Sequence, residues 1–204
     1  MRALVRAKSV VLALSVLAVY LASCTATEDD DTTSTFLNVV TVNALGDSEV
    51  GTTTRTLESD VCNLVEPEGE EPFCTVSQDF AVVSIAARPK DQTRDNLRSG
   101  DVVMERYRVT FVRADGRNVP GVDVPFPFDG ASNFVIPIFG SNAFTVVVVR
   151  AQSKLEPPLI NLRGLGGMVA LTVIAEIEFF GKDISGRPIS VTAFLNITFA
   201  DFAD

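Results

Sequence analysis

The sequence predicts an all-β fold, an antiparallel sandwich of about seven strands. Two observations support this prediction. Apolar and polar residues alternate with a period of two in several stretches, and turn-forming residues separate those stretches, whereas no stretch has a convincing helical period. The sequence also contains no strong internal repeat, so one sandwich over residues 36–204 accounts for everything after the N-terminal region.

The clearest pair of strands lies near the end of the sequence. Residues 169–180 alternate so that one face is fully apolar and the other is mixed. After turn-forming residues at 181–187, the alternation resumes over residues 189–199. We therefore expect a hairpin whose shared apolar face covers a core.

Five further strands are expected earlier in the chain, and three long loops take up the rest. A minimal sandwich needs only about 100 residues, so the surplus is assigned to loops. In the second loop, prolines at 120, 125 and 127 alternate with apolar residues, which suits an edge segment over the core or an exposed contact patch. The expected strands are 36–44, 76–87, 102–114, 134–139 and 144–152, and the expected loops are 45–75, 115–133 and 153–167.

The N-terminus has the pattern of a secretory signal peptide. Arg2, Arg6 and Lys8 precede an uncharged apolar run from Val10 to Tyr20. That run is shorter than the roughly 20 residues that cross a bilayer. We expect residues 1–23 to be a signal peptide and the remainder of the chain to be exported.

The residues Leu21-Ala22-Ser23-Cys24 resemble the lipobox of bacterial lipoproteins. The resemblance implies a diacylglyceryl group on the Cys24 sulfur, cleavage before Cys24 and acylation of the new amino group by a fatty acid such as palmitate. Two or more acyl chains hold a protein on a membrane without crossing it. Thr25, in place of the Asp that retains some lipoproteins at the inner membrane, favours the outer membrane by analogy. The alternative is an ordinary cysteine behind an ordinary signal peptide.

A short acidic segment follows the predicted lipid. Residues 24–35 include Glu28-Asp29-Asp30-Asp31 among Thr and Ser, which is typical of a solvated tether rather than of a sorting or cation-binding signal. The full chain has a net charge of −9; all 26 acidic residues but only 14 of the 17 basic ones follow Cys24, so the processed chain would carry −12. Such a charge disfavours nucleic acid as a partner.

The remaining cysteines, Cys62 and Cys74, are an even pair. In an oxidising compartment such a pair predicts a disulfide, here around an acidic loop rich in turn formers. Closing a loop of this size stabilises a fold by about 3 kcal/mol in the chain-entropy model. The spacing differs from the C-x-x-C of redox-active thiols, which argues against catalysis by these cysteines.

The sequence lacks the groups of most enzyme active sites. It has no histidine, which excludes Ser-His-Asp and Cys-His arrangements, and it has no G-x-S-x-G, S-x-x-K or P-loop motif. We therefore expect a protein that is not an enzyme and needs no cofactor.

Two kinds of ligand remain as alternatives. Glycan binding usually relies on Trp or Tyr platforms, but the chain has no Trp and, beyond the signal, only Tyr107. Calcium prefers clustered oxygen ligands in loops, for which Asp115, Asp123 and Asp129 are weak candidates. Asp-Gly is also a common turn signal without any ligand, and this interpretation is the better one here.

The expected strand number and lengths resemble immunoglobulin-like modules of bacterial surface proteins, a likeness that implies no activity. The sequence thus predicts a non-catalytic, membrane-anchored lipoprotein of the bacterial cell envelope with a structural or protein-interaction role. Its expected partners are the membrane, through the lipid on Cys24, and another envelope protein. The alternative is an exported lipoprotein that binds glycan or calcium.

Overall fold

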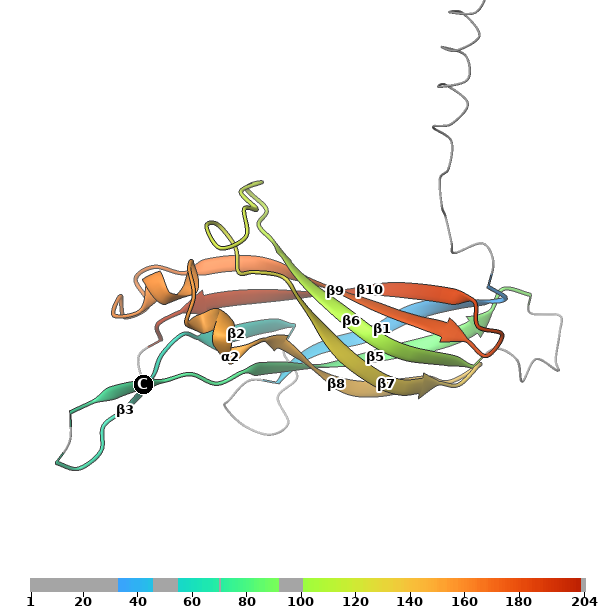
Figure 1. Cartoon of the computed structure of the whole chain (residues 1–204), viewed down its shortest axis with the longest axis horizontal. Coiled ribbons are helices and arrows are strands. Elements are labelled where there is room, and N and C mark those ends of the chain that lie inside the picture. The colour runs from blue at the N-terminus through green and yellow to red at the C-terminus, as the bar shows by residue number, and fades with distance from the viewer. Residues whose placement is uncertain (1–32, 46–54, 70, 92–100, 203–204) are drawn as a thin grey trace, which may run out of the picture. The chain divides into compact units, whose positions relative to one another are not determined.

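The computed structural model describes residues 33–45, 55–69, 71–91 and 101–202 (Figure 1). The predicted signal peptide, Cys24 and nearly all of the tether lie outside these residues. The described part is all-β, as predicted, with one short α-helix and one short 3₁₀ helix. The elements are β1 (Thr35–Leu45), β2 (Thr56–Asp60), β3 (Asn63–Val65), β4 (Phe73–Thr75), β5 (Asp79–Pro89), β6 (Val102–Val112), β7 (Phe128–Ile136), β8 (Ser141–Val149), α2 (Ala151–Lys154), η3 (Leu159–Leu162), β9 (Leu171–Asp183) and β10 (Pro188–Ala200).

A five-stranded sheet has the order β2-β10-β9-β6-β7. The predicted C-terminal hairpin is confirmed, with β9 and β10 antiparallel from Leu171 opposite Phe199 to Lys182 opposite Pro188. Every second residue of β9 is buried, which explains the fully apolar face in the sequence. β2 joins the free edge of β10 in parallel and therefore pairs residues that are distant in sequence.

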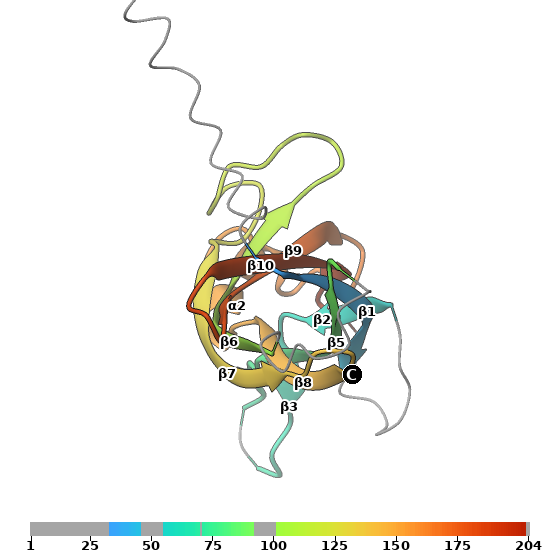
Figure 2. The ribbon, with the colours of Figure 1, turned by 90° about the vertical axis from the view of Figure 1, so that its right-hand side faces the viewer.

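A three-stranded sheet of order β1-β5-β8 faces the larger sheet. Viewed along the length of the domain, the two curled sheets enclose one common interior (Figure 2). Both contribute buried side chains to a single apolar core. Its central members are Ala81, Val83, Ile85, Val109, Phe111, Val146, Val148, Ile177, Phe179, Leu195 and Ile197.

The two sheets are joined along the side where β7 and β8 meet. The ring of Phe134 in β7 stacks on that of Phe144 in β8, with centroids 3.4 Å apart. The backbone N–H of Val147 donates to the hydroxyl of Tyr107, which reaches across from β6 (3.3 Å). Burial raises the pKa of Tyr107, and the hydrogen bond from Val147 opposes that rise.

The structure differs from the expected strand pattern in three places. The predicted loop 45–75 contains β2, β3 and β4, so the described residues form ten strands rather than about seven. β7 begins at Phe128, inside the predicted loop 115–133. The strand expected to reach residue 152 ends at Val149, because Ala151–Lys154 turns into α2 and helical residues occupy part of the predicted loop 153–167.

No helix within the described ranges is long and apolar enough to span a bilayer.

Candidate functional site

A two-stranded hairpin extends from the domain at the end opposite to the start of β1 (Figure 1). We call residues 62–75, which include β3 and β4, the arm. The two strands pair antiparallel, with Leu64 opposite Cys74 and Val65 opposite Phe73. Gly69 has a φ of +80°, a conformation that glycine adopts without steric cost, and it lies in the turn at the tip.

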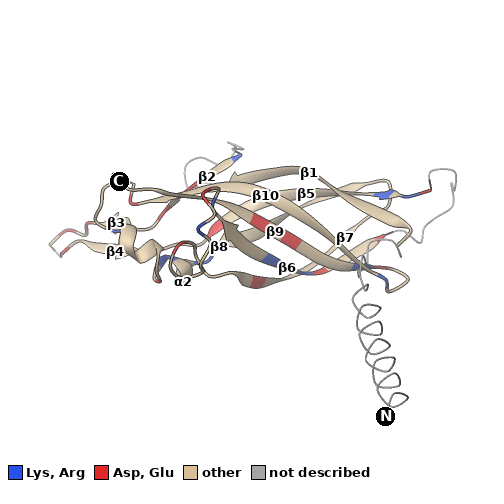
Figure 3. Cartoon of the chain, turned by 90° about the horizontal axis from the view of Figure 1, so that it is seen from above, with Lys and Arg blue, Asp and Glu red and all other residues tan. Residues whose placement is uncertain are grey.

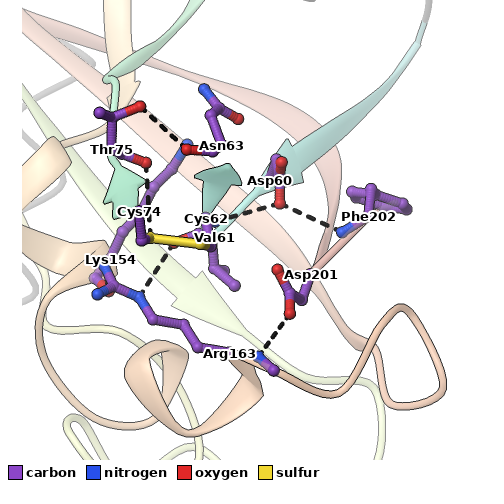
Figure 4. The surroundings of a disulfide bond; sticks show 11 residues. Asp60, Val61, Cys62, Asn63, Cys74, Thr75, Lys154, Arg163, Asp201 and Phe202 are labelled. Atoms are coloured by element: carbon purple, nitrogen blue, oxygen red, sulfur yellow. Dashed lines mark hydrogen bonds between the residues drawn. A yellow bond between two sulfur atoms is a disulfide. The ribbon is translucent and has the colours of Figure 1, made fainter. Parts of the chain in front are cut away.

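A covalent bond closes the base of the arm. Cys62 and Cys74 form the predicted disulfide, with Cα atoms 5.2 Å apart (Figure 4). Beside it, the hydroxyl of Thr75 donates to the carbonyl of Asn63 across the two strands (3.1 Å). The hairpin is therefore held at the point where its strands leave the domain.

Hydrogen bonds fix this base to the C-terminal end of the five-stranded sheet. The Asp60 carboxylate accepts the backbone N–H groups of Cys62 and Phe202, each at 3.2 Å (Figure 4). The N–H of Val61 donates to Ala200, and the Val61 carbonyl accepts from Arg163 Nε (3.2 Å). The chain entering the arm is thus held to the domain at Asp60, at Val61 and at the N–H of Cys62.

A buried ion pair lies beneath the base. Arg163 also donates to the Lys154 carbonyl (3.0 Å), and the Lys154 side chain, 1% exposed, pairs with Asp79 at 3.1 Å. The hydroxyl of Ser59, fully buried, donates to the same carboxylate at 2.6 Å. Sequence reasoning missed this network, although Asp79 is a charged residue at an inward position of the pattern Asp79, Ala81, Val83 and Ile85.

The arm itself exposes apolar side chains on both of its faces. Val65 and Phe73 are cross-strand neighbours and share one face, and Phe73 is 48% exposed. Leu64 lies on the other face with the disulfide and is 47% exposed. Leu64, Val65 and Phe73 are therefore three large apolar side chains grouped on the arm and in contact with water.

The tip of the arm is acidic. Glu66, Glu68 and Glu71 are exposed, and Glu70 adjoins them in the sequence. Within the described ranges no lysine or arginine forms an ion pair with any of the first three. On β6 and β9, in contrast, basic and acidic residues occur on neighbouring strands (Figure 3), with Arg108 opposite Glu178.

The three weak calcium candidates are not gathered into one site. The Asp115 carboxylate binds Arg113 and Arg117, at 2.6 and 2.9 Å. Asp129 instead lies near two arginines of β6, and Asp123 accepts the backbone N–H of Val119 (3.2 Å). Among the described residues no group of three or more Asp, Glu, Cys or His side chains is arranged to hold a metal ion.

The charge around Asp115 has a consequence for its titration. Burial raises the pKa of Asp115. The hydrogen bonds from Arg117 and Arg113 and the charge of Arg113 lower it by more, so that the pKa is about 2. The Asp115 carboxylate therefore stays ionised, and paired with Arg113 and Arg117, down to low pH.

Comparison with known proteins adds no family. No protein-family model and no curated protein sequence matches the chain. Among solved structures, the X-ray structure of Northeast Structural Genomics Consortium target SoR45 aligns with 82% of this chain and 86% of its own, at 10% identity and a TM-score of 0.33. A likeness at this level transfers neither a fold family nor an activity.

Proposed function

We propose that this protein is a non-catalytic lipoprotein of the bacterial cell envelope that works by contacting another protein through the arm. The observation that carries the proposal is the exposure of Leu64, Val65 and Phe73 on a hairpin whose base is covalently closed. Large exposed apolar residues that are grouped together mark contact sites more often than scattered ones do.

The anchoring part of the proposal rests on the sequence before the domain. The lipobox would place acyl chains on Cys24, and each buried methylene contributes about 0.8 kcal/mol to membrane binding. The acidic residues that follow would separate the domain from the lipid. The disulfide between Cys62 and Cys74 agrees with an oxidising compartment, and we propose the outer membrane as the destination.

The arm lies far from the point at which the tether would join the domain. β1 begins at one end of the domain and the arm extends from the other (Figure 1). Within the domain, the arm and the start of β1 therefore lie at opposite ends (Figure 1). The acidic side chains at the tip of the arm, Glu66, Glu68 and Glu71, support protein contact rather than binding of the arm to an anionic membrane.

We also propose that the two sheets are a variant of the immunoglobulin-like sandwich. Antiparallel pairing and a single core between two sheets support this relationship. The parallel pairing of β2 with β10 and the added arm would be its departures from that plan.

The anchoring test compares the wild type with Cys24→Ala in cells supplied with radioactive palmitate. We expect label on the wild type and on Cys62→Ser/Cys74→Ser, which keeps Cys24, but none on Cys24→Ala. Label retained on Cys24→Ala would contradict the proposed anchor.

The contact role is tested by affinity isolation from detergent-solubilised envelope. We expect one protein to be recovered with the wild type at a constant ratio. Recovery of no specific protein, together with binding to a glycan array, would replace the contact role with ligand binding.

A further inference from the structure

We propose that the arm inserts into a cleft of its partner protein, and that this cleft is apolar inside and bordered by lysine and arginine. The inference rests on the proposed contact function and specifies the chemistry of the partner. It follows from which side chains the arm exposes, how they are distributed and how the arm is held.

The distribution of apolar residues indicates a cleft rather than a flat surface. Val65 and Phe73 occupy one face of the hairpin, whereas Leu64 occupies the opposite face. A flat partner would cover only one of these faces and leave the other in water. A cleft covers both, and anchoring of large apolar side chains in such pockets supplies most of the binding energy in many interfaces.

The charge of the arm indicates what borders the cleft. Glu66, Glu68 and Glu71 are exposed at the tip without basic partners among the described residues. A partner with lysine and arginine around its cleft would attract this tip during approach and orient it on binding. An acidic or neutral border would lose this attraction or oppose it.

The base of the arm suits insertion because its geometry is set before binding. The disulfide and the bond from Thr75 to Asn63 hold the strands together, and Asp60 holds them to the domain. A preformed contact element loses less conformational entropy on binding than a loop that must first become ordered.

Other occupants fit the arm less well. Strand addition needs a longer edge than the three residues of β3 or β4. A second copy of the processed chain would carry the same net charge of −12, and its Arg106, Arg108, Arg113 and Arg117 are already close to aspartates. An anionic lipid surface would repel the tip.

The test uses photocrosslinking in cells that make the full-length chain. The photoreactive amino acid benzoylphenylalanine replaces Phe73 or, as a control, Phe194, an exposed phenylalanine on β10. We expect an adduct with one protein that is at least tenfold stronger from position 73 than from position 194. Peptide mapping should place the attachment among apolar residues with lysine or arginine beside them.

A charge comparison completes the test. Glu66→Gln/Glu68→Gln/Glu71→Gln should reduce the adduct from position 73 at least fivefold. The matched control Glu58→Gln/Glu105→Gln/Glu178→Gln removes the same charge from the sheets and should leave the adduct unchanged.

Several outcomes would overturn the inference. The absence of any adduct from position 73 is one such outcome, and an adduct whose yield is unchanged by replacement of the arm glutamates is another. An adduct with a second copy or with lipid, or attachment beside acidic residues, would also contradict it. If position 73 captures a protein but the adduct does not depend on the arm glutamates or maps beside acidic residues, the contact through the arm stands and the inference about the cleft fails. If position 194 captures a protein and position 73 does not, the proposed contact through the arm fails with it. If no position captures a protein, the contact function itself fails.

Discussion

At the scale of single residues, the ion pair between Lys154 and Asp79 is the least expected feature of the domain. Both side chains are almost fully buried, and removing two charges from water is costly. The two oxygens of the Asp79 carboxylate accept hydrogen bonds from Lys154 and from the Ser59 hydroxyl. The negative charge of Asp79 and the positive charge of Lys154 therefore compensate each other inside the domain. Because Arg163 links the Lys154 backbone to Val61, the pair also supports the base of the arm.

Replacing Lys154 by methionine should destabilise the domain strongly. The change removes the cation that compensates the buried Asp79 carboxylate, and breaking a buried pair in this way costs about 3–5 kcal/mol. Lys182→Met is the matched control, because its pair with Glu105 is about half exposed and such pairs contribute at most about 1 kcal/mol. Urea denaturation measures both free energies of unfolding. Equal losses in the two variants would show that the buried pair is not special.

A second residue-scale prediction concerns the pKa of Asp115, which is lowered to about 2 by Arg117 and Arg113. Since the folded pKa lies below the usual value, this carboxylate stabilises the fold at neutral pH, and its contribution is lost as pH falls from about 4 towards 2. Carboxyl-carbon NMR should show that midpoint. Arg117→Gln should raise it, whereas Arg108→Gln, beside Asp129, should not. An unchanged midpoint in Arg117→Gln would contradict the assigned cause.

At the scale of elements, the arm consists of two strands of three residues each, which cannot form a stable hairpin alone. Its order therefore depends on the disulfide at its base and on the hydrogen bonds that join this base to Asp60 and Arg163. The proposed contact surface therefore depends on the disulfide between Cys62 and Cys74 as well as on the exposed side chains of the arm.

Removal of the disulfide should test this dependence. In Cys62→Ser/Cys74→Ser the closed loop between cysteines 12 apart is lost, which should lower the free energy of unfolding by about 2–4 kcal/mol. Thr75→Val, which loses only one hydrogen bond, should cost about 1 kcal/mol. Hydrogen exchange should show protection lost outright at Val65, whereas β9 and β10 stay protected and lose only the amount by which the global free energy of unfolding falls. Protection retained at Val65 would mean that the disulfide is not what orders the arm.

The elements that the sequence predicted are those with long alternating patterns. β1, β5, β6, β9 and β10 each have at least eleven residues, and their apolar periodicity identified them. The nine-residue strands β7 and β8 were also predicted, but with displaced bounds. β2, β3 and β4 were missed because five- and three-residue strands give too little pattern among Pro, Gly and Glu. The even pair of cysteines in an exported chain predicted the disulfide at the base of the arm, but the ion pair beneath it joins residues 75 apart, which no local pattern reveals.

At the scale of the whole domain, two sheets share one core and are joined along the side of β7 and β8. Neither sheet has a separate core to retain if the other is lost. The described residues from 33 onward also belong to one compact unit. The sheets should therefore lose their structure together, and the stability of the arm's base should follow that of the core.

A chain that begins at residue 25 offers a direct measurement of this cooperativity. It has no tryptophan, and its single tyrosine, Tyr107, reaches between the sheets, so tyrosine fluorescence reports on their junction while circular dichroism reports on strand content. In urea the two signals should change at the same midpoint, as in a two-state transition. Phe144→Leu, which disrupts the stack with Phe134, should lower both midpoints together through a loss of about 1–2 kcal/mol. A tyrosine transition at lower urea than the loss of strands would show that the junction opens before the sheets unfold, and that the domain is less unified than its shared core implies.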